Sequence, residues 1–287
     1  MNAKTALCCL IGNPVEHSIS PLIHNTLAER MGINLAYAAA KVETDAVGDA
    51  IKGAKALGVR GMNVTVPHKC TVMDYLDEID ELAYKIGAVN TIVTTDKGYK
   101  GYNTDIIGLG RQLDEEGIVV TDNEVIILGA GGASKAITYL CASKGAKRVW
   151  LLNRSLDKAV ELADEVNRSF GDIVKPLSIN DFKQIPQGKY PVIQTTSVGL
   201  HPNDDAAPIE DESFYDLVSA GVDIIFNPPE TKFMKLCKAH GANAYNGLKM
   251  LLYQGIAGFE LWNNVKVSDE LAKDILTLME KEMNQNG

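Results

Sequence analysis

The segment from Gly129 to Ser134 has the composition of a loop that binds phosphate. It reads Gly-Ala-Gly-Gly-Ala-Ser, follows the apolar run Val-Ile-Ile-Leu and precedes an amphipathic stretch that ends near Lys144. Glycines let the backbone turn tightly and approach a pyrophosphate, which the positive end of a helix dipole then stabilises. Ser134 replaces the third glycine of the usual pattern. The prediction of a dinucleotide-binding βαβ unit therefore depends on the succession of a strand, a glycine turn and a helix.

Cations follow the second strand of this predicted unit. Arg-Val-Trp-Leu-Leu is followed by Asn153-Arg154-Ser155 and, three residues further, by Lys158. A site for NAD usually carries a carboxylate at this point to bind the ribose hydroxyl, whereas Arg and Lys attract a 2′-phosphate. The segment therefore favours NADP, and Asp157 could weaken that preference.

The amino-terminal third contains polar side chains where predicted strands end. Ser18 and Ser20 precede Pro21, a pattern typical of a capped helix start that could also present two hydroxyls to a small anion. The alternation of a strand places Asn63 and Thr65 on one face.

A proline follows that strand closely, and a lysine follows the proline. Pro67 predicts that a helix begins there, with Lys69 in its first turn. A cation in the first turn opposes the helix dipole, which hints at a chemical role for Lys69.

Two further polar positions allow both a structural and a chemical interpretation. Asn103, Thr104 and Asp105 are natural helix caps, and capping is their simplest role. Gln254 lies off the apolar stripe of a helix predicted to begin near 248, so it is either solvated or faces a cleft. The five histidines show no spacing that binds metal, so no metal site is expected.

Strands and helices alternate along the chain, which predicts an α/β fold with a mainly parallel sheet. The 287 residues suffice for about two domains. The net charge of −9 gives no basic surface for nucleic acid or an anionic membrane. The cysteines Cys8, Cys9, Cys70, Cys141 and Cys237 lie in apolar runs without a C-x-x-C pair, as expected of buried free thiols in a reducing, cytoplasmic compartment. No apolar run reaches the length of a membrane span.

Seven motifs between residues 11 and 262 together resemble the shikimate dehydrogenase family. The motifs are Ser18-x-Ser20-Pro21, Asn63-Val-Thr65-x-Pro67-x-Lys69, Gly87-Ala-Val-Asn90-Thr91, Asn103-Thr104-Asp105, Gly129-Ala-Gly-Gly-Ala133, Asn153-Arg154-Ser155 and Asn246-Gly247-x-x-Met250-Leu-x-x-Gln254. Their order and spacing make the resemblance far more specific than the glycine loop by itself.

The resemblance implies the NADP-dependent, reversible reduction of 3-dehydroshikimate to shikimate, a step in the biosynthesis of aromatic amino acids. It implies a substrate domain formed by 1–105 plus 247–287 and a Rossmann-type NADP domain formed by 106–246, in a cytoplasmic monomer or homodimer. Lys69 would be the acid/base beside Asp105. The implied substrate ligands are Ser18, Ser20, Asn63, Thr65, Asn90, Asp105, Phe226 and Gln254. The implied cofactor ligands are Gly129, Ala130, Gly131, Gly132, Ala133, Asn153, Arg154, Ser155, Lys158, Ile224 and Gly247.

One position departs from the family pattern. The family usually has Tyr where this chain has Phe226. Loss of a hydroxyl removes a hydrogen bond worth about 0.5–1.5 kcal/mol, which leaves room for a quinate/shikimate dehydrogenase that uses NAD or both cofactors. A two-domain NADP dehydrogenase that acts on folate and a non-catalytic NADP-binding regulator would also carry a glycine loop of this kind. A regulator would need neither Lys69 nor Asp105.

Overall fold

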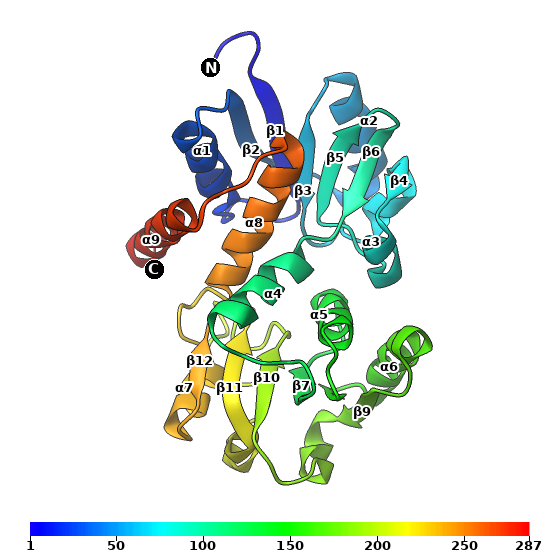
Figure 1. Cartoon of the computed structure of the whole chain (residues 1–287), viewed down its shortest axis with the longest axis vertical. Helices are drawn as coiled ribbons and strands as arrows, with labels where there is room; N and C mark the ends of the chain where they lie inside the picture. The colour runs from blue at the N-terminus through cyan, green and yellow to red at the C-terminus, as the bar shows by residue number, and fades with distance from the viewer. Residues whose placement is uncertain (287) are drawn as a thin grey trace. The chain divides into compact units, whose positions relative to one another are not determined.

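The computed structural model describes residues 1–286 and, for side chains, residues 1–283. The chain divides into two compact units, which are described separately (Figure 1). Unit 1 comprises Met1–Gly108 and Leu251–Asn284, and unit 2 comprises Leu109–Met250. The divisions fall within helices α4 (Asp105–Glu115) and α8 (Leu248–Asn263).

Unit 1 is built on a mixed six-stranded sheet with the order β2-β1-β3-β5-β6-β4. Its strands are β1 (Ala6–Gly12), β2 (Leu35–Lys41), β3 (Gly61–Val64), β4 (Glu78–Ile79), β5 (Thr91–Thr95) and β6 (Gly98–Tyr102). β1 pairs in parallel with β2 and β3, whereas β5 is antiparallel to both β3 and β6. The antiparallel pairing sets Asn63 opposite Thr91.

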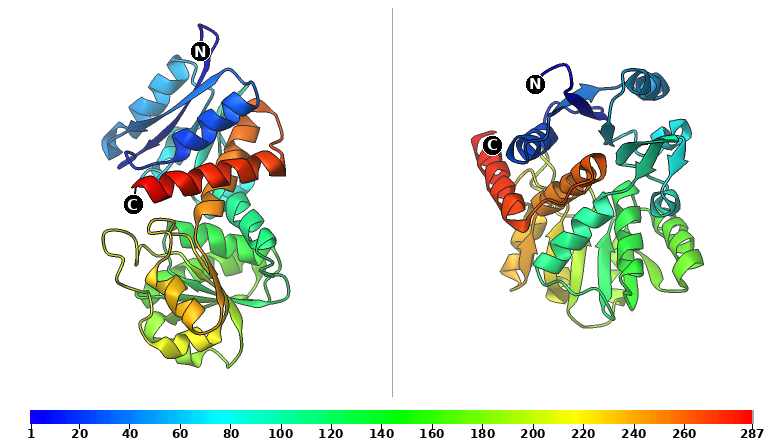
Figure 2. Two further views of the ribbon diagram at one scale, coloured as in Figure 1. Left: turned by 90° about the vertical axis from the view of Figure 1, so that its left-hand side faces the viewer. Right: turned by 45° about the horizontal axis from the view of Figure 1, so that its top comes forward.

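The two faces of this sheet bury different kinds of side chains. On one face, β1, β3 and β5 pack against α2 (Val47–Ala56), the 3-10 helix η2 (Thr71–Tyr75) and α3 (Glu81–Ile86) in an apolar cluster. On the other face lie α1 (Ser20–Arg30), α8 and α9 (Asp269–Asn286) (Figure 2). Here His24 stacks on Tyr37 at 4.2 Å and lies 4.9 Å from Trp262, measured between ring centroids. This second face also carries Asn63 and Thr91, so it combines aromatic and polar groups.

Unit 2 is a doubly wound domain around an all-parallel sheet of order β12-β11-β10-β7-β8-β9. Its strands are β7 (Glu124–Leu128), β8 (Arg148–Asn153), β9 (Val174–Ser178), β10 (Tyr190–Gln194), β11 (Val218–Asp223) and β12 (Asn243–Tyr245). Its helices include α5 (Gly132–Ser143), α6 (Leu156–Phe170) and α7 (Lys232–Ala239), with the 3-10 helices η3 (Ile179–Gln184) and η4 (Glu212–Leu217). Counted from β7, the order is that of a Rossmann domain, in which ligands bind where the winding reverses. That point lies between β7 and β10.

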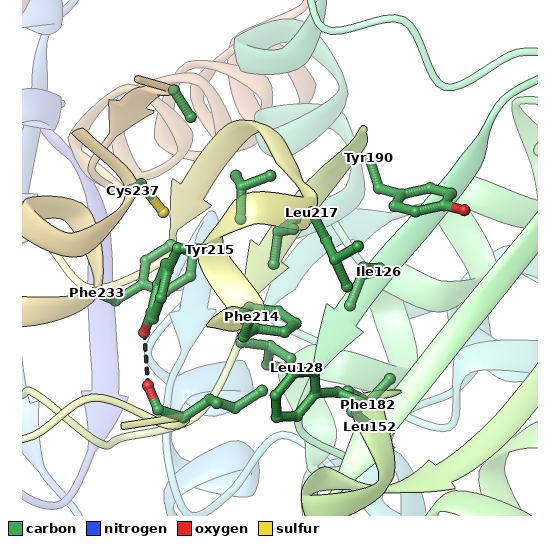
Figure 3. Close-up of a cluster of buried hydrophobic side chains, with 14 of the residues drawn as sticks. Ile126, Leu128, Leu152, Phe182, Tyr190, Phe214, Tyr215, Leu217, Phe233 and Cys237 are labelled. Atoms are coloured by element: carbon green, nitrogen blue, oxygen red, sulfur yellow. Dashed lines mark hydrogen bonds between the residues drawn. The ribbon is translucent and has the colours of Figure 1, made fainter. Parts of the chain in front are cut away.

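A cluster of aromatic and aliphatic side chains forms the core of one side of unit 2 (Figure 3). Phe214, Tyr215 and Phe233 are at most 1% exposed, and Phe214 meets Phe182 edge to face with 5.4 Å between centroids. The Tyr215 hydroxyl donates to the Ile209 carbonyl over 2.8 Å, so this polar group within the apolar core is paired. The cluster includes Phe182 of η3 and Phe214, Tyr215 and Leu217 of η4, so both 3-10 helices contribute side chains to this core.

The expected α/β class is confirmed, and several local predictions are wrong. Pro67 does not open a helix: residues 66–70 form a turn, and η2 begins only at Thr71. Ser20 is the first residue of α1 rather than its cap, which is Ile19; the backbone N–H of Ser20 donates to the Ser18 hydroxyl.

The cysteines are free, as expected, but two of the five are not fully buried: Cys9 is partly buried and Cys70 is exposed. Cys8, Cys141 and Cys237 are buried, and burial raises the pKa of each thiol to about 12. Cys70 is exposed because it lies in the turn that replaces the expected helix. None of the described helices is long and apolar enough to span a bilayer.

His24 makes the stability of unit 1 sensitive to acid. It is completely buried, and burial lowers its pKa from 6.5 to about 3. The unfolded chain therefore binds a proton that the folded chain excludes, so stability is present above pH 6.5 and is lost as the pH falls toward 3. We expect wild type to lose roughly 3 kcal/mol of unfolding free energy between pH 6.5 and 4 through this residue, and His24→Phe to lose much less.

Denaturant unfolding at several pH values measures this difference. His17→Phe, at an exposed histidine, is the matched control. Its free energy of unfolding should change with pH as that of wild type does. Parallel pH profiles for His24→Phe and wild type would contradict the prediction.

Candidate functional site

Lys69 and Asp105 form an ion pair that remains accessible to a ligand. The Lys69 ammonium lies 2.7 Å from Oδ2 of Asp105, and the side chains are 29% and 14% exposed. Charge-assisted hydrogen bonds of this length are strong, and partial burial reduces their screening by water. The pair presents a cation that can donate a proton and an anion that holds it in place.

Backbone contacts fix the two members of the pair from different parts of the sequence. The turn that carries Lys69 accepts a hydrogen bond at the Lys69 carbonyl from the N–H of Val89, over 2.8 Å. Asp105 begins α4 directly after β6. The loop before β5 thus connects the turn that carries Lys69 to the sheet. The position of Asp105 is set by β6, which ends at Tyr102, shortly before it.

Asn90 binds the second oxygen of Asp105. Its Nδ2 donates to Oδ1 of Asp105 over 2.8 Å and to Oε1 of Gln254 over 3.3 Å. Gln254 is 8% exposed, so the interpretation of this residue as a solvated side chain is wrong. Because its own Nε2 donates to the Leu251 carbonyl, the Gln254 amide is oriented by α8.

The remaining substrate candidates of unit 1 carry hydroxyls and amides. The Ser18 hydroxyl donates to that of Ser20 over 3.1 Å, and Ser20 lies beside Tyr37. Asn63 is 4% exposed: its Oδ1 accepts from the Tyr37 hydroxyl and its Nδ2 donates to Asn90 O and to Thr91 Oγ1. Thr65 follows β3 and is partly exposed.

Unit 2 contains a pocket of about 620 Å³ at the point where its winding reverses. Seven of the residues expected to bind the cofactor line it: Gly129, Ala130, Gly131, Asn153, Arg154, Ser155 and Lys158. The pocket also contains residues absent from that prediction: Ile179, Thr195, Thr196, Ser197, Val198 and Pro208. Thr195 to Val198 directly follow β10, at the carboxyl end of a parallel strand, where the ligands of open α/β sheets gather.

The glycine loop leaves room for a phosphate at the start of α5. Gly129 has φ of 114°, and an added Cβ would lie 2.5 Å from Oγ1 of Thr195, so only glycine fits. Around Gly131 and Gly132, an added Cβ would meet nothing within 4 Å. Gly131 is the N-cap of α5 and offers no side-chain cap, so the first N–H groups of the helix are available to an anion.

Arg154 and Lys158 provide positive charge at the same pocket. Both are exposed, and neither forms an ion pair with any residue whose side chain is described. Unpaired cations beside a phosphate-sized loop fit a dinucleotide that carries an additional phosphate.

Four further cofactor candidates and Phe226 lie in unit 2 outside this pocket lining. Gly132 and Ala133 begin α5. The N–H of Gly247 donates to the Ile225 carbonyl, and an added Cβ there would lie 2.1 Å from the Ile224 carbonyl oxygen. Ile224 and Gly247 are therefore neighbours. Phe226 is partly exposed in the loop after β11.

The residues with described side chains contain no cluster of three or more His, Cys, Asp or Glu that could hold a metal ion.

Family models match both units. The model of the shikimate dehydrogenase substrate binding domain matches residues 10–92, and the shikimate / quinate 5-dehydrogenase model matches residues 113–188. The chain is also 40% identical over 266 residues to a shikimate dehydrogenase (NADP(+)) of Methanococcus maripaludis, covering 93% of this chain and 94% of that protein. The chain belongs to the shikimate dehydrogenase family.

Solved structures of shikimate dehydrogenases have the same fold. One, a complex with NADP+, superposes with a TM-score of 0.87 at 40% identity and covers 96% of each chain. Another, from Thermus thermophilus, contains NADP(H) and shikimate and superposes with a TM-score of 0.84 at 30% identity, covering 95% of this chain and 99% of that one. The expected family and fold are thus confirmed for this shikimate dehydrogenase family member.

Proposed function

We propose that this family member reduces 3-dehydroshikimate to shikimate reversibly with NADPH, with Lys69 as the acid/base. The observation that carries the proposal is the accessible ion pair of Lys69 and Asp105, whose two carboxylate oxygens are held separately by Lys69 and Asn90. The relatives named above as NADP-dependent shikimate dehydrogenases support the same activity.

Each group of unit 1 has a chemical role in this reaction. When bound, NADPH supplies a hydride to the ring carbonyl carbon. Lys69 donates a hydrogen bond to the carbonyl oxygen and then the proton that the resulting alkoxide requires. Asp105 holds the ammonium in position, and in the oxidation direction Lys69 accepts the proton from the substrate hydroxyl.

The polar side chains around the pair suit a small hydroxylated acid. Ser18 and Ser20 would donate hydrogen bonds to the carboxylate, while Thr65, Asn90, Asp105 and Gln254 would bind ring hydroxyls. Asn63 would accept a hydrogen bond from a ring hydroxyl at the remaining lone pair of Oδ1, since both hydrogens of its Nδ2 are bonded within the protein. Phe226 would contribute an apolar contact without the hydroxyl of a tyrosine.

NADP fits the pocket of unit 2 on three observations: the open space around Gly131 and Gly132, the uncapped start of α5, and the unpaired Arg154 and Lys158. The pyrophosphate would bind at the glycine loop, and the two cations would bind the 2′-phosphate. Gly129, Ala130, Ala133, Asn153, Ser155, Ile224 and Gly247 complete the proposed cofactor contacts.

We also propose a cytoplasmic location, because the five free cysteines suit a reducing compartment. We propose that the protein is a monomer or a homodimer.

An assay of nicotinamide absorbance with shikimate or quinate, each with NADP and NAD, tests the function. We expect the highest kcat/KM for shikimate with NADP. Quinate is the second candidate, because Phe226 lacks a hydroxyl and the matching family model covers both substrates. Comparable rates with quinate would favour a quinate/shikimate dehydrogenase, and absence of turnover in all four reactions would leave only NADP binding.

Lys69→Ala should lower kcat by at least about 10²-fold, because proton transfer by a positioned group contributes roughly 10²–10⁴-fold. KM for NADP should stay unchanged, since Lys69 and the nucleotide pocket belong to different units. Lys97→Ala, which removes an exposed lysine paired with Glu78, is the control. Turnover that survives Lys69→Ala would exclude the assigned role.

Arg154→Ala should raise KM for NADP by about 10–100-fold, the equivalent of losing a hydrogen bond to a charged group. KM for NAD should change little because NAD lacks the 2′-phosphate. Arg168→Ala, at an exposed arginine near the end of α6, should alter neither value. Equal losses for the two cofactors would show that Arg154 does not bind the 2′-phosphate.

A further inference from the structure

A continuous chain of hydrogen bonds connects the buried Tyr37 to the Lys69–Asp105 pair. It starts where the Tyr37 hydroxyl meets Oδ1 of Asn63 at 2.7 Å and where Nδ2 of Asn63 meets Oγ1 of Thr91 at 3.1 Å. From Thr91 it continues to Oγ1 of Thr104 at 2.9 Å and from there to Oδ1 of Asn90 at 3.1 Å. Nδ2 of Asn90 completes the path to Asp105.

The backbone determines the orientation of both asparagine amides. The N–H of Thr104, which can only donate, lies 2.7 Å from the Asn90 side chain, so that end must be the oxygen. The Asn90 carbonyl oxygen, which can only accept, lies 3.3 Å from the Asn63 side chain, so that end must be the nitrogen. The first contact turns the NH₂ group of Asn90 toward Asp105 and Gln254. The second turns the NH₂ group of Asn63 toward Thr91 and its oxygen toward Tyr37.

The orientations of the amides determine the direction of the two hydroxyls between them. Thr91 accepts a hydrogen from Asn63, and Thr104 donates its hydrogen to Asn90. The hydroxyl of Thr91 must therefore donate to that of Thr104. Both threonines are 0% exposed, so water cannot replace either partner. Every donor along the path thus points from Tyr37 toward Asp105.

We propose that Thr104 and Thr91 are positioning residues: the Thr104 hydroxyl adds to the bond from its own backbone N–H, and the two together hold the Asn90 amide, and through it the Asp105 carboxylate, in the orientation that the reaction requires. The inference rests on the proposed function, since Asp105 matters as the partner of Lys69. Two buried threonines could otherwise serve only to fill space between β5 and α4, in which case valine would replace either one without a specific kinetic effect.

Thr104→Val and Thr104→Ser separate these possibilities, because valine keeps the volume and serine keeps the hydroxyl. We expect Thr104→Val to lower kcat/KM for shikimate by about 10-fold, because the buried Thr91 hydroxyl loses its acceptor and Asn90 Oδ1 keeps only the bond from the Thr104 N–H. KM for NADP should stay unchanged. Thr104→Ser should restore activity to within ~3-fold of wild type. Thr94→Val is the control. It removes a hydroxyl on β5, the strand that also carries Thr91, but this hydroxyl donates to the Val59 carbonyl and lies outside the path.

A double-mutant cycle with Asn90→Ala tests whether Thr104 acts through Asn90. If it does, adding Thr104→Val to Asn90→Ala should cost less than ~2-fold in kcat/KM, because the group that Thr104 positions is already absent. Thr91→Val tests the same path from its other end and replaces Thr104→Val if that variant does not fold; the same non-additivity is expected.

The activity of the wild type distinguishes failure of the positioning role from failure of the proposed function. A wild-type chain that does not oxidise shikimate with NADP would overturn both. An active wild type with equal losses from Thr104→Val in the presence and absence of the Asn90 amide would overturn the positioning role alone. A lower unfolding temperature with unchanged kcat/KM would also overturn it.

Discussion

The carboxylate of Asp105 is the point on which the proposed chemistry depends. One of its oxygens accepts a hydrogen bond from the Lys69 ammonium and the other from the Asn90 amide. An ammonium free in water would sample many positions, whereas an ion pair with one fixed member has a defined donor direction. Partial burial is the necessary compromise: deeper burial would cost several kcal/mol of desolvation per ion, and full exposure would let salt and water screen the pair.

Close packing of α8 on the sheet of unit 1 completes this site. An added Cβ at Gly61 would lie 2.2 Å from the Trp262 ring, and one at Gly258 would lie 3.4 Å from Nδ2 of Asn63. The missing side chains let the helix approach the strands, and the Trp262 indole N–H donates to the Ile92 carbonyl. That approach places Gln254 against Asn90, although 164 positions separate them in the sequence.

The proposed site in unit 2 differs from that in unit 1, because a pyrophosphate is bound by backbone N–H groups rather than by an ion pair. The winding of the sheet reverses between β7 and β10, and the pocket lies at their carboxyl ends. There Gly129 has φ of 114° and lies close to the hydroxyl of Thr195. The same loop ends in an uncapped helix start at Gly131. The sheet therefore determines where the proposed phosphate site lies, and the uncapped N–H groups at the start of α5 would bind the phosphate.

Local patterns in the sequence determined the βαβ unit of unit 2, its glycine loop and the adjacent cations, since each depends on residues close together in the chain. Resemblance to a family supplied Lys69, Asp105 and Gln254 as candidates. Only the tertiary structure decided that the lysine lies in a turn, that Gln254 is buried against Asn90, and that Thr91 and Thr104 join two amides. The physical reason is that the direction of a buried hydrogen bond depends on partners from distant strands, which no local periodicity records.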